Sequence, residues 1–292
     1  NSLNQYNKMD NTHDIVIIGA GLTGLTTAFA LHQKNRNVTI LESDNKIGGQ
    51  IQSHHVNGFV FEGGPNTGVI KYPEVMGLFH SLNDKCELEI AKESAKKRLI
   101  WKGNKFHELP SGPISAITTP LFTTYDKLRI LTEPFRAKGN NPDESIAQMT
   151  KRRLGNSYLN YAVDPFLAGV YAANPMMLPT RYALPKLYEL EQNYGSFILG
   201  AIKKARQPKT DRDKTATKEV FSTRGGLSNL TKAMADKIGS DNIILNTKSI
   251  SITPSANGFV IDYTVNGQQR QIKCCRELPG DGAFTRCGNA VN

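Results

Sequence analysis

The alternation of apolar and polar residues predicts a strand, a helix and a second strand near the start of the chain. Residues 15–18 form a β-branched apolar run, which is typical of a strand buried on both faces. A helical pattern runs from Leu22 to about Gln33, and residues 37–41 form the next apolar strand. The order strand–helix–strand indicates an α/β fold with a parallel sheet.

The middle of the chain, from residue 114 to about residue 205, has a helical pattern that prolines divide into short segments. Asp126 is a candidate helix cap, and Ser145 with Gln148 forms a capping-box pattern. Periodicity leaves open whether a set of apolar side chains here faces a membrane, a hydrophobic substrate or a buried helical core. These are Leu121, Phe122, Tyr125, Leu128, Phe135 and Phe166.

Further elements flank this helical block. Residues 72–83 have helical spacing, and residues 99–109 are typical of a β-hairpin in which we expect Trp101 to lie in the core. After a charged segment at 207–218, the α/β pattern resumes with strands, a glycine turn, a helix and a hairpin: 219–222, 224–227, 228–238, 243–245, 249–252 and 258–273. The sheet is therefore predicted to come from separated pieces of chain, with the helical block inserted between them.

Three glycines at the first strand–helix junction carry the first chemical signal. Gly19, Gly21 and Gly24 have the G-x-G-x-x-G spacing, which allows a tight turn, the approach of a pyrophosphate and close helix–strand packing. Free N–H groups at the helix N-terminus then face the phosphates. Glu42 ends the second strand, where an acceptor for a ribose 2′-hydroxyl is expected, and it argues against NADP. A tight turn in another α/β protein would explain the glycines but not Glu42.

Two later glycine pairs indicate FAD rather than a nicotinamide cofactor. Gly48 and Gly49 follow the acid closely, and extended FAD needs further backbone contacts of this kind. Residues 62–67, Glu-Gly-Gly-Pro-Asn-Thr, predict a stiff turn whose N–H groups can face a diphosphate or the edge of a flavin. A simple hairpin turn is the alternative for this segment.

Composition narrows the classes of partner and compartment. The chain has 292 residues, enough for two domains, and a formal net charge of +10. No basic stripe is interleaved with aromatics, so we expect no nucleic-acid partner. The polar first 13 residues lack an apolar core, and the four cysteines form neither a disulfide framework nor a zinc pattern. We therefore expect a cytoplasmic location and no metal.

The glycine motifs, Glu42 and the segment Ile-Gly-Gly-Gln at 47–50 together resemble the FAD-binding half of the flavin amine oxidase superfamily. Within it, the helical block is similar to the oxygen-dependent, FAD-containing protoporphyrinogen oxidases. This closer resemblance is carried by segments 163–175, 184–191 and 195–200, and the segment Arg-Gly-Gly-Leu-Ser-Asn-Leu at 224–230 agrees with it.

The resemblance implies an α/β fold: a Rossmann-like FAD-binding domain of the GR2 type, with an inserted helical domain and a partial mixed β-sheet substrate domain. Residues 13–72 and 219–252 would form the FAD-binding domain, and residues 113–205 the helical domain that faces membrane and substrate. Residues 73–112 and 253–273 would form the partial substrate-binding β region. We expect residues 1–12 and 274–292 to be disordered or foreign ends.

The resemblance also implies which residues contact FAD. The first glycine loop would hold the pyrophosphate, Glu42 the ribose, Gln50 the surroundings of the ADP, and the second Gly-Gly turn the flavin, with Ser249 at the adenine. The full set is Gly19, Ala20, Gly21, Leu22, Thr23, Gly24, Glu42, Ser43, Gln50, Gly64, Pro65, Asn66, Thr67 and Ser249.

The implied reaction removes six electrons from a porphyrinogen in three flavin cycles, with dioxygen reoxidising the flavin. No catalytic side chain is implied, because the cofactor carries the redox step and the protein positions the macrocycle. Gly169, in a predicted turn, is the substrate-side candidate through its backbone, and a structural glycine is the competing interpretation. Some members carry an arginine where this chain has Asn66, so another cation would meet a propionate here. Peripheral membrane contact and a homodimer are further expectations of the resemblance.

The last residues depart from the family pattern. Relatives continue much further and return to the FAD domain with a glycine-rich strand–helix, whereas residues 274–292 match nothing in the family. We therefore expect a chain truncated at its C-terminus that binds FAD weakly or not at all and whose activity is in doubt. Coproporphyrinogen oxidation, another amine oxidase or desaturase activity, and an inactive nucleotide-binding fragment remain the alternatives.

Overall fold

The computed structural model describes residues 12–82, 85–110, 112–208, 217–256 and 258–275. The chain divides into two compact units, residues 1–91 with 212–292 and residues 92–211. Residues 92–112, which we assigned to the substrate-binding β region, thus lie in the second unit with the helical block. The roles assigned to the domains stay predictions.

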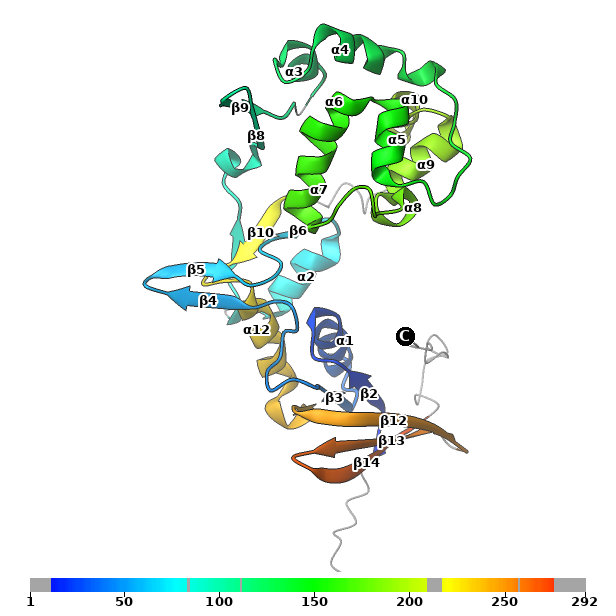
Figure 1. The fold of residues 1–292 in the computed structure, drawn as a ribbon. Helices are drawn as coiled ribbons and strands as arrows, with labels where there is room; N and C mark the ends of the chain where they lie inside the picture. Colours follow the sequence, from blue (N-terminus) through cyan, green and yellow to red (C-terminus); the bar gives the residue numbers. More distant parts are fainter. Residues whose placement is uncertain (1–11, 83–84, 111, 209–216, 257, 276–292) are drawn as a thin grey trace, which may run out of the picture. The chain divides into compact units, whose positions relative to one another are not determined.

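A parallel sheet of three strands forms the centre of the first unit, in the order β11–β3–β2 (Figure 1). Its strands are β2 (Ile15–Ile18), β3 (Val38–Leu41) and β11 (Ile243–Ile244). Helix α1 (Leu22–His32) connects β2 to β3, which confirms the predicted strand–helix–strand. β11 pairs with β3 from the far end of the chain, which confirms that the sheet is built from separated pieces.

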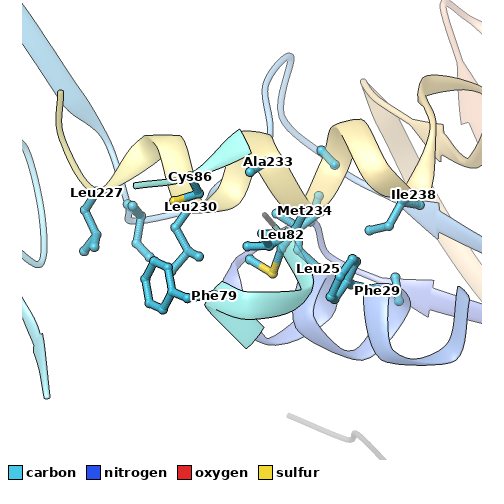
Figure 2. Packing of buried hydrophobic residues seen from close by; sticks show 14 of the residues in the cluster. Leu25, Phe29, Phe79, Leu82, Cys86, Leu227, Leu230, Ala233, Met234 and Ile238 are labelled. Atoms are coloured by element: carbon cyan, nitrogen blue, oxygen red, sulfur yellow. The ribbon is translucent and has the colours of Figure 1, made fainter. Parts of the chain in front are cut away.

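Helices cover one face of this sheet. The core contains Leu25 and Phe29 of α1, Phe79 and Leu82 of α2 (Pro73–Leu82), and a row from α12 (Ser228–Ile238). Figure 2 shows the α12 side chains Leu230, Ala233, Met234 and Ile238 packing along α1 and α2. Their i, i+3, i+4 spacing is why the sequence predicts this helix.

A second sheet covers the opposite face. It runs in the order β1–β14–β13–β12 and consists of β1 (Thr12–His13), β12 (Thr247–Ser255), β13 (Gly258–Val265) and β14 (Gln268–Cys275). Side chains alternate between the two cores as a strand requires, because Ile40 packs on the helices while its neighbour Leu41 packs on the second sheet. Asn266 and Gly267 both have positive φ at the predicted hairpin turn.

The expected disordered ends need a correction at their inner limits. Thr12 pairs with Lys273, and β14 continues through Cys274 and Cys275, so these residues belong to the sheet. These residues have no apolar pattern of their own, so the sequence placed them outside the fold. They are ordered because Thr12 pairs with β14, and Cys274 and Cys275 pair with β13. Residues 1–11 and 276–292 lie outside the described residues.

Short antiparallel strands in the first unit carry the remaining glycine loops. β4 (Ser53–Val56) and β5 (Phe59–Glu62) form a hairpin that leads into the loop at 63–67. β10 (Val220–Thr223) lies between β6 (Gly68–Val69) and β7 (Leu88–Ile90) and leads into the glycine turn before α12.

In the part that the structure describes, the second unit consists of short helices and one β-hairpin. Its helices are α3 (Pro113–Thr118), α4 (Thr124–Leu131), α5 (Ile146–Arg153), α6 (Asn156–Tyr158), α7 (Asp164–Tyr171), α8 (Thr180–Ala183), α9 (Pro185–Tyr194) and α10 (Phe197–Ala205). A π-helical turn (Leu159–Val163) joins α6 to α7, and β8 (Leu99–Lys102) pairs with β9 (Lys105–Glu108). Among the described residues, every helix is too short or too polar to cross a membrane.

Local predictions in this unit had mixed outcomes. The capping box of Ser145 and Gln148 at α5 is confirmed. Asp126 is not the cap of α4, because Thr123 occupies that position and Asp126 is its capping-box partner. Trp101 is 58% exposed rather than in the core, because its ring packs edge-on against Phe106, which is itself 65% exposed.

A buried ion network holds the second unit together. Arg153 is fully buried and donates from Nε to Glu133 Oε1 at 2.6 Å and from Nη1 to Glu191 Oε1 at 3.0 Å. Glu133 in turn accepts hydrogen bonds from the Ser196 hydroxyl and the Phe197 amide at the start of α10. A charge this deep in the fold is stable only because every partner is supplied.

This network predicts loss of stability in acid. Burial alone would raise the pKa of Glu133, but hydrogen bonds from Ser196, Phe197 and Arg153 outweigh it and hold the pKa below its ordinary value of 4.5. A carboxyl whose folded pKa is lowered stabilises the fold above its unfolded pKa and loses that effect as pH falls through the folded value. We expect the free energy of unfolding to fall steeply below about pH 5. Urea titrations at a series of pH values give the free energy of unfolding as a function of pH. We expect this free energy to fall less steeply with decreasing pH for Glu133→Gln than for the unmodified chain. An equal fall in both proteins would contradict the prediction.

Candidate functional site

Two glycine loops that lie apart in the sequence pack together after β2 and β3. The Gly48 amide donates to the Ala20 carbonyl at 2.8 Å, and Gly21 and Gly48 form a parallel β-bridge. A Cβ on Gly49 would lie 3.3 Å from Gly21 Cα, which is tighter than ordinary contact. Gly48 and Gly49 also have positive φ, so glycine is needed for both the turn and the close approach.

The third glycine loop, at 63–67, packs on the second. A Cβ on Gly64 would lie 2.0 Å from the Gln50 carbonyl oxygen, so only glycine allows this approach. The residues from Gly63 to Thr67 are exposed, and Gln50 is exposed beside them. The structure therefore brings the three predicted loops to one edge of the first unit, although it does not test which atoms of a cofactor they meet.

The N-terminus of α1 is open to an anion. Its cap residue, Gly21, offers no side chain, and the first turn contains no acid. Leu25 N makes the first helical hydrogen bond, to Gly21 O at 2.9 Å, so the amides of residues 22–24 precede the helical ladder. A Cβ at Gly19 or Gly21 would meet nothing within 4 Å. Free donors beside open space fit a pyrophosphate.

Glu42 is a buried carboxylate at the end of β3. It accepts hydrogen bonds from the amides of Ala20 and Asp44 and from the Ser43 hydroxyl. Burial alone would raise the pKa of Glu42, but the donors from Asp44, Ala20 and Ser43 outweigh it, so the pKa is lowered and the group is ionised at neutral pH. Its Oε2 atom accepts from the Ala20 amide and keeps lone-pair capacity for a hydroxyl donor.

Glu62 joins distant loops in a way that the sequence analysis missed. Its carboxylate accepts from the Leu227 amide and the Ser53 hydroxyl, each at 2.7 Å, and the Ser228 amide donates to the same Ser53 hydroxyl. This network fixes the start of α12 to the hairpin that leads into residues 63–67. The signal available in the sequence was an acid directly before a Gly-Gly pair, with a second Gly-Gly turn at 225–226.

The end of β3 also contacts the strand that contains Ser249. Thr247 N donates to the Glu42 carbonyl, and Lys248 Nζ donates to the Ser43 carbonyl, both at 2.8 Å. Ser249 itself is exposed, has a φ of +52° and lies at a bulge between β12 and β13. Its assignment to the adenine stays a prediction, and Thr247 and Lys248 are the residues that the structure places against Glu42 and Ser43.

Gly169 lies in helix α7 rather than in a turn, which corrects the local prediction. The chain turns at Ala172 instead, whose φ is +48°. A Cβ at Gly169 would meet nothing within 4 Å, so no close packing requires glycine there within this unit. Its role toward a substrate stays a prediction. Among the described residues, no cluster of histidine, cysteine or acidic side chains could hold a metal ion.

Known proteins that are similar to this chain identify its family. The family model "Flavin containing amine oxidoreductase" matches residues 22–275, and the chain belongs to that family. FAD is the cofactor of this fold, and the open α1 N-terminus, the ionised Glu42 and the packed glycine loops fit it.

Curated relatives within the family confirm the resemblance to protoporphyrinogen oxidases that the sequence indicated. The chain is 31% identical to protoporphyrinogen oxidase 2 of Arabidopsis thaliana over 82% of its length and 50% of the relative's. It is 29% identical to coproporphyrinogen III oxidase of Staphylococcus aureus over 89% of its length and 59% of the relative's. The chain thus spans about half the length of the relatives that it matches.

Solved structures confirm the fold class. A provisionally named protoporphyrinogen oxidase from Exiguobacterium sp. superposes with a TM-score of 0.61 at 21% identity, covering 88% of this chain and 57% of the other. At this identity the likeness concerns the fold alone. The α/β FAD-binding fold expected from the sequence is therefore present.

Proposed function

We propose that this chain is part of an FAD-dependent oxidase that converts protoporphyrinogen IX to protoporphyrin IX, with dioxygen as the electron acceptor. The observation that carries the proposal is the identity of about one third to plant protoporphyrinogen oxidases across most of the chain. This stretch includes the helical segments at 163–200 on which the resemblance first rested.

In this proposal the residues of the chain bind FAD and orient the porphyrinogen. The open amides of α1 hold the pyrophosphate, Glu42 accepts from a ribose hydroxyl, and residues 64–67 border the flavin. When bound, FAD supplies the hydride acceptor for the porphyrinogen. The helical unit would position the macrocycle, with the Gly169 backbone as a contact. No side chain is assigned an acid–base role, since positioning alone accounts for a large share of such rates.

Coproporphyrinogen III is the second candidate substrate. The relative from Staphylococcus aureus, named for that activity, matches 89% of this chain, slightly more than the plant relatives do. A cytoplasmic location, peripheral contact with a membrane and assembly as a homodimer belong to the same proposal.

The cofactor contact of Glu42 can be tested by titrating FAD into the full chain and following flavin fluorescence. Glu42→Ala removes a charged acceptor worth about 1.5–3 kcal/mol, so we expect roughly 10- to 100-fold weaker binding. Glu42→Gln should fall between this variant and the unmodified chain. Asp44→Ala is the matched control, because that exposed carboxylate is the next acid along the chain. Equal affinities of the Glu42→Ala and Asp44→Ala variants would contradict the assignment.

The substrate is tested with reduced porphyrinogens in air. Chain loaded with FAD is mixed with protoporphyrinogen IX or coproporphyrinogen III, and porphyrin fluorescence is followed above the rate of spontaneous oxidation. A faster rise with protoporphyrinogen IX supports the proposal, and a faster rise with coproporphyrinogen III favours the second candidate. Turnover of amines or polyenes alone, or flavin binding without any turnover, would overturn it.

A further inference from the structure

A hollow of about 430 Å³ opens in the second unit beside α4, the end of α5 and the start of α6. Figure 1 labels these three helices in the green part of the chain. Two basic side chains, Arg129 and Lys151, line the hollow together with the polar residues Thr123, Asn156 and Ser157. Among the described residues, Asp126 is the one acidic residue that lines it. The hollow belongs to the helical unit, and nothing in the proposed flavin chemistry uses it.

The two lining cations have no carboxylate partner among the described residues, unlike their neighbours in the sequence. Arg129 Nη2 donates to the Lys151 carbonyl at 3.1 Å, and its buried Nε makes no hydrogen bond. By contrast, Arg152 pairs with Glu144 at 2.6 Å, and Arg153 is held in the buried network. The nearby carboxylates thus pair with Arg152 and Arg153. The positive charges of Arg129 and Lys151 at the hollow are left without a compensating carboxylate among the described residues.

Asp126 does not cancel this charge. Its carboxylate accepts from the Thr123 amide at 3.0 Å and the Thr123 hydroxyl at 2.7 Å, and the Ser157 hydroxyl also bonds to it. These bonds close the capping box at the start of α4. The carboxylate is therefore occupied by donors from Thr123 and Ser157, and two cations against one anion leave the lining positive.

We propose that this hollow binds a phosphate group through Arg129 and Lys151. A guanidinium and an ammonium are the usual pair for phosphate oxygens, and the Asn156 amide, which also lines the hollow, can complete the contacts. A soluble phosphate ester and the headgroup of an anionic lipid both present this chemistry. The lipid source is favoured by Tyr125, Leu128 and Leu131, which are 70%, 57% and 68% exposed on α4 beside the hollow.

The test compares single-charge variants of the full chain. Lys151→Gln removes an exposed ammonium that makes no ion pair with the described residues, and Arg129→Gln removes the second lining cation. Lys127→Gln is the matched control: two positions along a helix differ by about 200°, so Lys127 lies on the side of α4 away from Arg129. The probes are inorganic phosphate, followed by calorimetry, and vesicles of phosphatidylcholine with or without phosphatidylglycerol, followed by sedimentation.

We expect about fivefold weaker binding for Lys151→Gln and Arg129→Gln, and no change for Lys127→Gln. This pattern with phosphatidylglycerol vesicles identifies a lipid headgroup, and the same pattern with inorganic phosphate alone identifies a soluble ester. Either supports the site. Equal losses in all three variants, or no binding of either probe, would overturn it. Neither probe requires flavin or a porphyrinogen, so failure here is distinct from failure of the proposed enzyme activity.

Discussion

Replacement of Gly24 by alanine is expected to abolish FAD binding and to destabilise the first unit. A Cβ at this position would lie 2.0 Å from the Gly19 carbonyl oxygen and 3.4 Å from Ile17 Cγ2. Because the obstacle is backbone rather than a flexible side chain, α1 must move away from β2. Overpacking of this kind costs about 1–3 kcal/mol or more. The same movement would displace the amides of residues 22–24 that we propose bind the pyrophosphate.

The control for this prediction is a second helical glycine in the same unit. Gly77 is exposed in α2, and a Cβ there would meet nothing within 4 Å. Gly77→Ala should therefore stabilise the protein by about 0.5–1 kcal/mol, through helix propensity alone. Urea denaturation and FAD titration of both variants provide the measurement. A Gly24→Ala chain as stable as Gly77→Ala would show that the β2–α1 junction is looser than the structure indicates.

Replacement of Arg153 by leucine is expected to cost about 3–5 kcal/mol of unfolding free energy. The substitution leaves Glu133, which is 0% exposed, as a buried charge without its cation, and leaves Glu191, which is 1% exposed, paired with Arg152 alone. It also removes the hydrogen bond from Nη2 to the Gly195 carbonyl, at the turn between α9 and α10. Loss of this magnitude is a large part of the stability of an ordinary domain.

A surface ion pair in the same unit provides the comparison. Arg181 pairs with Asp143 at 2.6 Å, but the two side chains are 35% and 64% exposed. Arg181→Leu should cost no more than about 1 kcal/mol, because water and salt screen the pair. Denaturant titrations of both variants at neutral pH make the measurement. If the two leucine variants were equally stable, the Arg153 network would contribute no more than a surface contact.

The basic run at 151–153 illustrates a limit of sequence reasoning. Nothing in the sequence distinguishes these three cations. In the structure Lys151 is exposed, Arg152 is half-buried between two glutamates, and Arg153 is fully buried. The six apolar candidates of the helical block divide in the same way. Leu121 and Phe122 are buried, whereas Tyr125, Leu128 and Phe135 are exposed, and Phe166 is partly buried. Periodicity could not separate them because it reports a face and not what covers that face.

The sequence by itself determined the local elements. The β2–α1–β3 order, the capping box at Ser145 and the Asn266-Gly267 turn all follow from forces that act within a few residues, so short patterns specify them. The same holds for the glycine spacing at 19–24, which together with Glu42, the later glycine pairs and the helical segments at 163–200 was enough to indicate FAD and the family.

Only the tertiary structure decided which distant groups meet. Glu62 reaches the Leu227 amide across 165 positions, and the loops at 19–24, 47–50 and 63–67 pack on one another through glycine backbones. No local pattern encodes such contacts, because they depend on how the sheets and α12 pack. The placement of Arg153, of Trp101 and of the hollow beside Arg129 was decided by the same long-range packing.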